Sequence, residues 1–247
     1  MDLNSRPARV VILAGGKGTR LKPFTASFPK PLVPIGSMPI LEILLSQLQR
    51  QGFRDITLTV GHLAELIRAY FGDHRRLSEL LDISFVFEEE PTGTAGSLAS
   101  VPGLDDTFLT MNGDVLTNLD FNALVRSHRE SGAILTIAAH TKHVKIDLGV
   151  LDSTDGWLQD YVEKPEKHYD VSMGVYVYEP EVLNYIQPGQ YLDFPTLVLK
   201  LLGDGKKIWT YRSDAFWLDI GRPEDYAEAQ RIFEESPELF GFRRDDP

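Results

Sequence analysis

A short apolar run that ends in glycine, close to the start of the chain, constrains the fold more than any other feature. Val10–Ala14 is apolar throughout, and Gly15, Gly16 and Gly18 follow it almost directly. A strand buried in a parallel sheet has this kind of uninterrupted apolar run. Glycine permits positive φ and lets backbone N–H groups approach an anion, so a glycine turn after a buried strand commonly holds phosphate. The stretch therefore predicts an α/β protein with a phosphate-binding loop.

Strand-like and helix-like segments alternate through the first 140 residues. Apolar runs predict further strands at 56–60, 83–87, 107–111 and 134–139, and helical spacing predicts helices at 40–48, 63–71 and 121–131. After residue 140 we expect strands at 148–151, 158–162, 171–178 and 208–211, and helices at 181–186, 195–202 and 223–235. Alternation of this kind is typical of a Rossmann-like, mostly parallel sheet flanked by helices.

Composition excludes several classes of function. The 247 residues include 36 acidic and 25 basic side chains, and the formal net charge of -11 argues against general nucleic-acid binding, which usually needs a basic face. The absence of cysteine excludes disulfides, thiolate metal sites and a cysteine nucleophile. We find no apolar stretch long enough for a signal-peptide core or a membrane span, so we expect a soluble, cytoplasmic protein without a membrane partner.

The glycine loop matches neither of two common phosphate-binding motifs. Leu21 stands where the dinucleotide fingerprint needs its third glycine, and Gly18 stands where the Walker loop needs serine or threonine. Two cations follow the loop. Arg20 offers a planar, permanently charged fork that suits phosphate oxygens. Lys30 lies between two prolines that restrict the backbone, which suits an ammonium group that neutralises charge during a reaction.

Residues 13–42, LAGGKGTRLKPFTASFPKPLVPIGSMPILE, resemble the sugar-1-phosphate nucleotidyltransferases. The pattern of that family is Gly-x-Gly-Thr-Arg-Leu-x-Pro-x-Thr, followed by Pro-Lys-Pro. A second stretch, Pro-Thr-Gly-Thr-Ala-Gly at 91–96, resembles most the mannose-1-phosphate and heptose-1-phosphate guanylyltransferases. The resemblance covers about Arg9 to Glu234 and implies the reaction of a nucleoside triphosphate with a sugar-1-phosphate to give a nucleotide sugar and pyrophosphate. Because the sequence has no internal repeat and no sharp break in composition, we expect one domain, 1–247, with a nucleotide-binding half at about 9–140 and a sugar-phosphate half at about 141–235. Many members of the family carry a C-terminal β-helix of hexapeptide repeats, and we expect none here because the sequence has no such repeat.

The resemblance assigns roles at the nucleotide end. Arg20 would steady the leaving pyrophosphate, and Lys30 would offset charge at the α-phosphate. The residues that would contact the nucleotide are Leu13, Ala14, Gly15, Gly16, Lys17, Gly18, Thr19, Glu88, Gly93, Thr94 and Gly113. Glu88 would read the base, because a carboxylate only accepts hydrogen bonds and guanine offers two adjacent donors. The three glutamates at 88–90 also fit a solvated strand end, so the choice of GTP stays open.

Two aspartates follow strand-like segments at positions where the family binds its catalytic metal. Asp114 follows an Asn-Gly pair, and Asp219 lies in a Trp-x-Asp-x-Gly segment. Two hard oxygen ligands beside a triphosphate suit Mg²⁺, which shares its coordination shell with substrate phosphates. The resemblance therefore implies Mg²⁺ on Asp114 and Asp219, with Asp114 also catalytic. Taken singly, each aspartate also fits a turn or a helix cap.

The resemblance places five residues at the sugar phosphate. They are Gly149, Glu163, Lys164, Gly174 and Asp193. One departure is that Ser172-Met173-Gly174 replaces the Asn-Ala-Gly of many members, so the identity of the sugar stays open. His128, His140 and His143 lie among polar residues without metal-helix spacing, and we expect them at the surface.

Several alternatives remain at this stage. The chain fits a uridylyl- or thymidylyltransferase of another sugar-1-phosphate as well as a guanylyltransferase. A non-catalytic nucleotide-sugar-binding regulatory protein would share the fold, and an enzyme that uses a non-sugar phosphate would share the first loop. The sequence is also compatible with a homo-oligomer.

Overall fold

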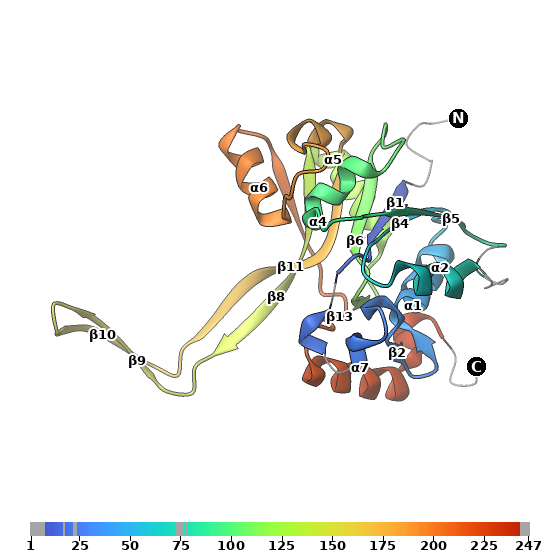
Figure 1. The fold of residues 1–247 in the computed structure, drawn as a ribbon. Coiled ribbons are helices and arrows are strands. Elements are labelled where there is room, and N and C mark those ends of the chain that lie inside the picture. The colour runs from blue at the N-terminus through green and yellow to red at the C-terminus, as the bar shows by residue number, and fades with distance from the viewer. Residues whose placement is uncertain (1–7, 17, 22–23, 73–76, 78, 243–247) are drawn as a thin grey trace.

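The computed structural model describes residues 8–16, 18–21, 24–72, 77 and 79–242. Its centre is a seven-stranded sheet in the order β12-β8-β11-β6-β1-β4-β5 (Figure 1). These strands are β1 (Arg9–Leu13), β4 (Asp55–Val60), β5 (Asp82–Phe87), β6 (Phe108–Asn112), β8 (Leu135–Lys145), β11 (Glu166–Tyr178) and β12 (Ile208–Arg212). All neighbours pair in parallel except β11, which is antiparallel to β6 and β8. The expected mostly parallel α/β fold is confirmed.

Helices cover both faces of this sheet. They are α1 (Ile40–Arg50), α2 (Ala64–Gly72), α4 (Gly93–Gly96), α5 (Phe121–Ser131) and α6 (Phe194–Gly203), whereas α7 (Pro223–Glu235) packs beside α1 and not on the sheet. The segment predicted as a helix at 181–186 is a 3-10 helix, Pro180–Tyr185. Short 3-10 turns are common connectors, and this one occupies only six residues between β11 and the loop that leads to α6. Further 3-10 turns lie at Thr19–Leu21, Phe24–Ala26, Lys30–Leu32, Ser97–Ser100 and Pro237–Phe240.

The apolar run of β1 is explained by burial on both faces. Val10 and Ile12 belong to the core beneath α1, α2 and α5, whereas Val11 belongs to the core on the opposite face, beneath α4 and α6. Successive side chains of a strand point to opposite faces, so a strand covered on both sides must be apolar at every position. A third core cluster joins α1, α7 and the hairpin of β2 (Pro34–Ile35) and β3 (Met38–Pro39).

Helix α5 illustrates how the local sequence determines where a helix begins and ends. The Asp120 carboxylate accepts a hydrogen bond from the Ala123 N–H over 2.9 Å at its start, and Gly132 ends it at φ 62°. Its inner face includes His128, which is 1% exposed, so the expected surface position is wrong. His128 Nδ1 lies 2.7 Å from Thr136 Oγ1, and its Nε2 lies 2.9 Å from Glu179 Oε1. Both ring nitrogens therefore have partners, which makes burial of the imidazole tolerable.

Residues 140–172, called the arm below, extend out of the sheet (Figure 1). Beyond residue 139, β11 is the one partner of β8 among the described strands, and the end of the arm is a separate hairpin of β9 (Gly149–Thr154) and β10 (Trp157–Glu163). The predicted strand segments at 148–151, 158–162 and 171–178 are confirmed as strands. Their projection away from the body is a feature that the sequence pattern did not predict.

One further small sheet pairs β7 (Val115–Thr117) with β13 (Trp217–Asp219). No helix within the described ranges is long and apolar enough to cross a membrane. A C-terminal β-helix is also absent from the residues that the structure describes.

Candidate active site

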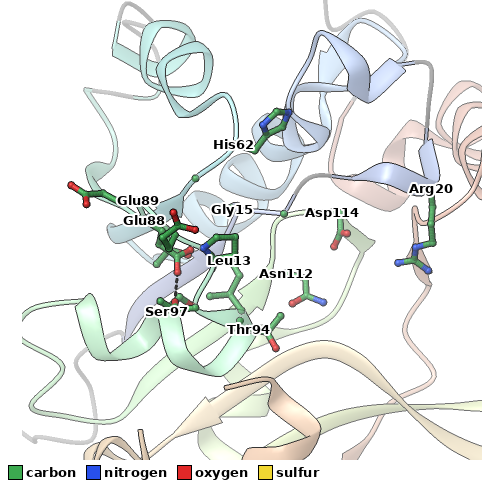
Figure 2. A pocket seen from close by; sticks show the side chains of 17 residues that line it. Leu13, Gly15, Arg20, His62, Glu88, Glu89, Thr94, Ser97, Asn112 and Asp114 are labelled. Atoms are coloured by element: carbon green, nitrogen blue, oxygen red, sulfur yellow. Dashed lines mark hydrogen bonds between the residues drawn. The ribbon is translucent and has the colours of Figure 1, made fainter. Parts of the chain in front are cut away.

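A cavity of about 550 Å³ opens at the carboxyl ends of β1, β4, β5 and β6. It is lined by Leu13, Gly15, Gly16, Arg20, Thr59, Gly61, His62, Glu88, Glu89, Glu90, Pro91, Thr92, Gly93, Thr94, Ser97, Asn112 and Asp114. Figure 2 shows Glu88 and Ser97 at one end, Arg20 and Asp114 at the other, and Gly15 between them. Ligands of open α/β sheets bind at this edge, because the loops after neighbouring parallel strands meet there.

The glycine loop forms the floor of the cavity. A Cβ on Gly15 would lie 2.8 Å from Glu88 Oε2, so glycine is needed where the loop passes under that carboxylate. Gly18 has φ 58°, and its carbonyl accepts hydrogen bonds from Thr25 Oγ1 over 2.7 Å and from the Leu21 N–H over 3.0 Å. The turn is thus held by contacts to the Gly18 carbonyl, and glycine turns of this kind can present backbone N–H groups to an anion.

The other predicted loop residues occupy different positions. Ala14 is buried and donates its N–H to the Thr59 carbonyl over 2.9 Å, so it supports the loop from below. Gly113 donates its N–H to the Leu13 carbonyl over 2.9 Å. Thr19 is exposed on the 3-10 turn, and Lys17 lies outside the described residues.

A buried ion pair connects the glycine loop to the end of β6. Lys30 is 8% exposed, and its ammonium group donates to Asp114 Oδ2. The second oxygen, Asp114 Oδ1, is buried and has no hydrogen-bond partner among the described residues. A buried carboxylate oxygen without a partner is unfavourable unless a bound group satisfies it. Asp114 therefore has one oxygen committed to a cation of the chain and one available for a ligand.

Asp219, which lies about a hundred residues further along the chain, is next to Asp114 in the structure. The antiparallel pairing of β13 with β7 sets Asp219 opposite Val115, next to Asp114, and the Ile220 N–H donates to the Asp114 carbonyl over 3.4 Å. Burial raises the pKa of Asp219, and the nearby Asp114 carboxylate raises it further, while Lys30 and Arg20 act in the opposite direction. The pair of aspartates is therefore a site where a divalent cation would relieve repulsion.

Residues that the sequence analysis did not assign complete this end of the site. A Cβ on Gly221 would lie 3.4 Å from Arg20 Nη1 and 3.5 Å from Asp219 Oδ2, so this glycine lies between the two groups. The pKa of Tyr176 is raised by burial and, to a lesser extent, by the carboxylates of Asp114 and Asp219. Gly221 was visible in the Trp-x-Asp-x-Gly pattern, whereas Tyr176 had no signal beyond strand alternation.

Asn112, His62 and Ser97 also line the cavity without having been predicted. Asn112 ends β6, and His62 comes two residues after β4 ends, so position after a strand end was the signal that could have found these two. Ser97 lies in the 3-10 turn after α4, and its Oγ is buried without a hydrogen-bond partner among the described residues.

The second glycine loop forms the opposite end of the cavity. The Thr92 hydroxyl donates to Glu88 Oε1, which orients that carboxylate. Gly93 has φ 84°, and a Cβ there would lie 2.5 Å from the Leu192 carbonyl oxygen, because the loop before α6 packs directly on it. Thr94 Oγ1 accepts the Phe194 N–H over 2.9 Å. These contacts join the loop after β5 to the N-terminus of α6.

The five residues predicted at the sugar phosphate are divided between two regions. Gly174 has φ 71° at a bulge of β11, and its Cα faces the cavity-lining Asn112, whose Nδ2 would lie 2.7 Å from a Cβ at this position. Asp193 caps α6 by accepting the Thr196 N–H over 2.9 Å, and this contact lowers its pKa. Gly149, Glu163 and Lys164 belong to the arm and do not line the cavity.

The tip of the arm has its own internal contacts. The Tyr161 hydroxyl donates to Glu163 Oε2 over 2.7 Å, and the Tyr161 ring occupies the space where a Cβ on Gly149 would be. Lys164 is a non-glycine residue with φ 47°. Nearer the root of the arm, the ligand atoms of His143, Glu166 and His168 lie within 4.8 Å of one another, all on exposed side chains. This cluster is separate from the aspartate pair of the cavity.

Comparison with known proteins identifies the family. Residues 9–236 match the family model described as nucleotidyl transferase. The chain belongs to this family. The resemblance predicted from the glycine loop is thereby confirmed, and this nucleotidyl transferase can be compared with characterised members.

Two curated relatives have different named activities. The chain is 37% identical to a UTP–glucose-1-phosphate uridylyltransferase of Synechocystis, over 90% of this chain and 62% of that protein. It is 35% identical to a mannose-1-phosphate guanylyltransferase of Mycobacterium tuberculosis, over 94% of this chain and 67% of that protein. The chain thus spans about two thirds of the length of these relatives.

A solved structure gives a comparison at the level of the fold. HddC from Yersinia pseudotuberculosis, crystallised with GMP-PN, matches with a TM-score of 0.68 at 28% identity, over 92% of this chain and 100% of that one. A second solved structure, a glucose-1-phosphate thymidylyltransferase from Bacillus anthracis described as putative and bound to sucrose, has a TM-score of 0.72 at 20% identity, over 98% of this chain and 97% of that one, and supports the fold alone.

Proposed function

We propose that this nucleotidyl transferase converts a nucleoside triphosphate and a sugar-1-phosphate into a nucleotide sugar and pyrophosphate. One observation carries the proposal. A single cavity is lined by the glycine loop that follows β1, by Arg20 and by Asp114. Lys30 and Asp219 lie beside Asp114 at the same cavity. A non-catalytic nucleotide-binding protein has no need of a buried lysine–aspartate pair beside a second aspartate. The names of both curated relatives agree with this chemistry.

The reaction needs positioning and charge neutralisation more than covalent chemistry. An oxygen of the sugar phosphate attacks the α-phosphorus in line, the bond from that phosphorus to the bridging oxygen breaks, and pyrophosphate leaves. The N–H groups of Gly15–Gly18 would hold the phosphates, and Arg20 would contact the departing pyrophosphate. Lys30 would offset charge at the α-phosphate, since its ammonium group is already held beside Asp114.

The aspartates fit a divalent metal ion, for which we propose Mg²⁺. Asp114 Oδ1 has no hydrogen-bond partner among the described residues, and Asp219 lies next to Asp114. These two side chains would supply the oxygen donors of a Mg²⁺ ion that also binds substrate phosphates. When bound, the ion would supply positive charge beside the phosphates and help to orient them. Lys30 holds the other oxygen, Asp114 Oδ2, in place, so the oxygen that faces the ion does not need to be ordered on binding.

We propose guanine as the base. Glu88 is an acceptor-only side chain at the end of the cavity opposite Arg20 and Asp114, held there by the Thr92 hydroxyl (Figure 2). Guanine presents two adjacent donors to such a carboxylate, whereas uracil and thymine present one donor between two acceptors. The named activity of the Synechocystis relative makes UTP the second candidate.

We propose that the chain divides functionally near residue 140. Residues 9–140 supply the glycine loops, Lys30 and Asp114, and residues 141–235 supply Gly174, Asp193, Asp219 and the arm residues predicted at the sugar phosphate. The two parts share the central sheet, because β11 lies between β6 and β8. The division is therefore one of role within a single domain.

Pyrophosphate release with Mg²⁺ tests the proposal directly. GTP, UTP, dTTP, CTP and ATP are offered separately with a pool of sugar-1-phosphates. We expect release with GTP, and for Glu88→Gln a fall of about 10- to 100-fold in kcat/KM for GTP, the loss of one charged hydrogen bond. Glu90→Gln, an exposed carboxylate of the same cavity, is the matched control and should retain activity. Release with UTP alone would refute the role of Glu88, and no release with any nucleotide would refute the transferase.

A further inference from the structure

Two of the residues predicted at the sugar phosphate do not line the cavity. Gly174 lies at the cavity wall, but Glu163 and Lys164 lie on the arm. Strands rise about 3.3 Å per residue, so the eight residues between Ser172 and Lys164 carry the lysine roughly 26 Å from the sheet edge. The radius of gyration expected for a compact domain of this length is roughly 18 Å. The arm, which includes Lys164, therefore extends beyond the body that carries it, as the ribbon of β8, β9, β10 and β11 shows (Figure 1).

The arm is held in this extended position by regular pairing. Residues 166–172 of β11 pair with residues 139–145 of β8 without interruption, and Arg212 Nε at the root lies 2.6 Å from Asp170 Oδ2. A register shift occurs only nearer the body, between Ser172 and Tyr176. Bringing Lys164 back to its own cavity would require bending this ladder at its root, so the structure favours an arm that acts away from its own body.

The surface of the arm is unusually apolar for a segment in water. Nine of the eighteen large hydrophobic side chains that are exposed within the described residues lie on it. Trp157 is 77% exposed and Leu148 is 74% exposed. Leu151 pairs with Tyr161 on one face of the tip hairpin, and Val150 pairs with Val162 on the other. A hairpin with apolar pairs on both faces is typical of one that is covered on both faces.

The tip hairpin also needs stabilisation from outside. It has only two strands, and isolated two-stranded hairpins are marginally stable in water. Neither of its outer edges pairs with another strand in the part of the chain that the structure describes, and unpaired edges readily pair with another chain. A partner that covers the tip would thus bury apolar surface and satisfy the strand edges together.

A second copy of this chain is the partner that fits best. Each copy has a cavity without Glu163 and Lys164, and each offers those residues on an arm. The cavity is rich in carboxylates, with Glu88, Glu89, Glu90 and Asp114 in its lining, and Lys164 brings a cation. In a two-fold dimer the same contact is made twice, so both sites are completed at once.

We propose that the arm of one copy completes the sugar-phosphate site of another, with Glu163 and Lys164 acting in trans. The inference rests on the proposed function, since it concerns the second substrate of the same reaction. Lys164 would contact the sugar phosphate, and Glu163, held by the Tyr161 hydroxyl, would contact the sugar hydroxyls. Lys30 and the aspartates of the receiving copy would act on the nucleotide.

Mixing two inactive variants tests the proposal. Lys30→Ala removes a cation of the body, and Lys164→Ala removes a cation of the arm. If the arm acts in trans, half of the randomly exchanged dimers are mixed, and each mixed dimer has one intact site. We therefore expect the mixture to regain about a quarter of the wild-type activity. If the arm acts in cis, every chain carries a lesion in its own site and the mixture stays inactive.

Subunit exchange must be verified in the same mixture, and isotope labelling does so. One variant is prepared with ¹⁵N, and dimers of intermediate mass are measured by native mass spectrometry. Mixed dimers without regained activity would overturn the proposal. Sedimentation of the wild-type chain at the assay concentration is the second test, because a fully active monomer would also overturn it.

The failure of the proposed function would be recognised separately. If the wild-type chain releases no pyrophosphate with any nucleotide, the transferase assignment fails. Chemical cross-linking can still show whether the arm of one copy contacts the cavity of another. Carbodiimide cross-linking of mixed ¹⁴N and ¹⁵N chains should then join Lys164 of one copy to cavity carboxylates of the other. Leu151→Glu on the arm should abolish these links and the dimer, whereas Leu199→Glu on α6, at a leucine that is 68% exposed against 61% for Leu151, should not. Links confined to one chain would refute the exchange.

Discussion

Replacement of Lys30 by methionine tests the buried ion pair of the cavity through stability rather than activity. Lys30→Met removes the ammonium group and leaves Asp114 without its partner. Breaking a buried pair from one side costs about 3–5 kcal/mol when the remaining charge is fully buried. The Asp114 side chain is 22% exposed toward the cavity, so some water reaches it and the cost falls to about 2–3 kcal/mol.

This cost converts into a measurable shift of the melting temperature. Unfolding entropies near 2.1 cal/mol/K per residue give roughly 0.5 kcal/mol/K for a chain of this length, so Lys30→Met should melt about 4–6 °C below wild type. Thermal unfolding followed by circular dichroism measures the shift. The same variant should lose about 10²–10³ in turnover if Lys30 stabilises charge in the transition state.

The double variant decides whether the pair itself is responsible. Lys30→Met with Asp114→Asn removes both charges and leaves neither unpaired, so it should be more stable than the sum of the two single effects predicts. We expect a coupling of about 1 kcal/mol or more from urea unfolding of the four proteins. Additivity within about 0.5 kcal/mol would refute the claim that the two side chains interact in the folded protein.

Two further predictions concern the second glycine loop and the buried histidine. Gly93→Ala places a Cβ 2.5 Å from a backbone oxygen at a residue with φ 84°, and it should destabilise the protein by about 2–3 kcal/mol. Gly205→Ala, where φ is 68° and no atom lies within 4 Å of the added Cβ, should cost about 1 kcal/mol. Urea unfolding measures both losses of stability, and equal losses would contradict the packing argument. The hydrogen bond with His128 lowers the pKa of Glu179, so its stabilising effect is present above the unfolded-state value of about 4.3 and is lost as the pH falls through the lower folded-state value. Glu179→Gln should therefore flatten the acid side of the stability profile measured by urea unfolding between about pH 6 and pH 3, while the exposed Glu181→Gln control keeps the wild-type slope.

The sheet and the glycine loop could be predicted because their signals are local. The run Val10–Ala14 predicts a buried strand without reference to other segments, since burial on both faces requires an apolar residue at every position. The turn that follows it needs glycine at Gly18 for its positive φ. Each of these requirements is satisfied by neighbours in sequence, so the pattern alone is informative.

The other features of the site and the fold could not be predicted from local sequence, because they depend on contacts between segments that are distant in the chain. Asp114 and Asp219 meet because two three-residue strands, β7 and β13, pair across a separation of about a hundred residues, and strands so short have no periodic signal. His128 is buried because Thr136 and Glu179 supply partners for both ring nitrogens. The strands of the arm were predicted, but their direction was not, because a strand pattern does not specify which neighbour it pairs with.

The construction of the arm has a consequence for how such a protein can diversify. Between residues 140 and 172 the two long strands pair with each other and with no other strand that the structure describes, so equal deletions from both would leave the register of the central sheet unchanged. Removing two residues from each strand would draw the tip inward by about 7 Å while every side chain kept its face. The length of the arm can therefore change in steps of two residues per strand. Such insertions or deletions would match substrates of different size without altering the nucleotide cavity.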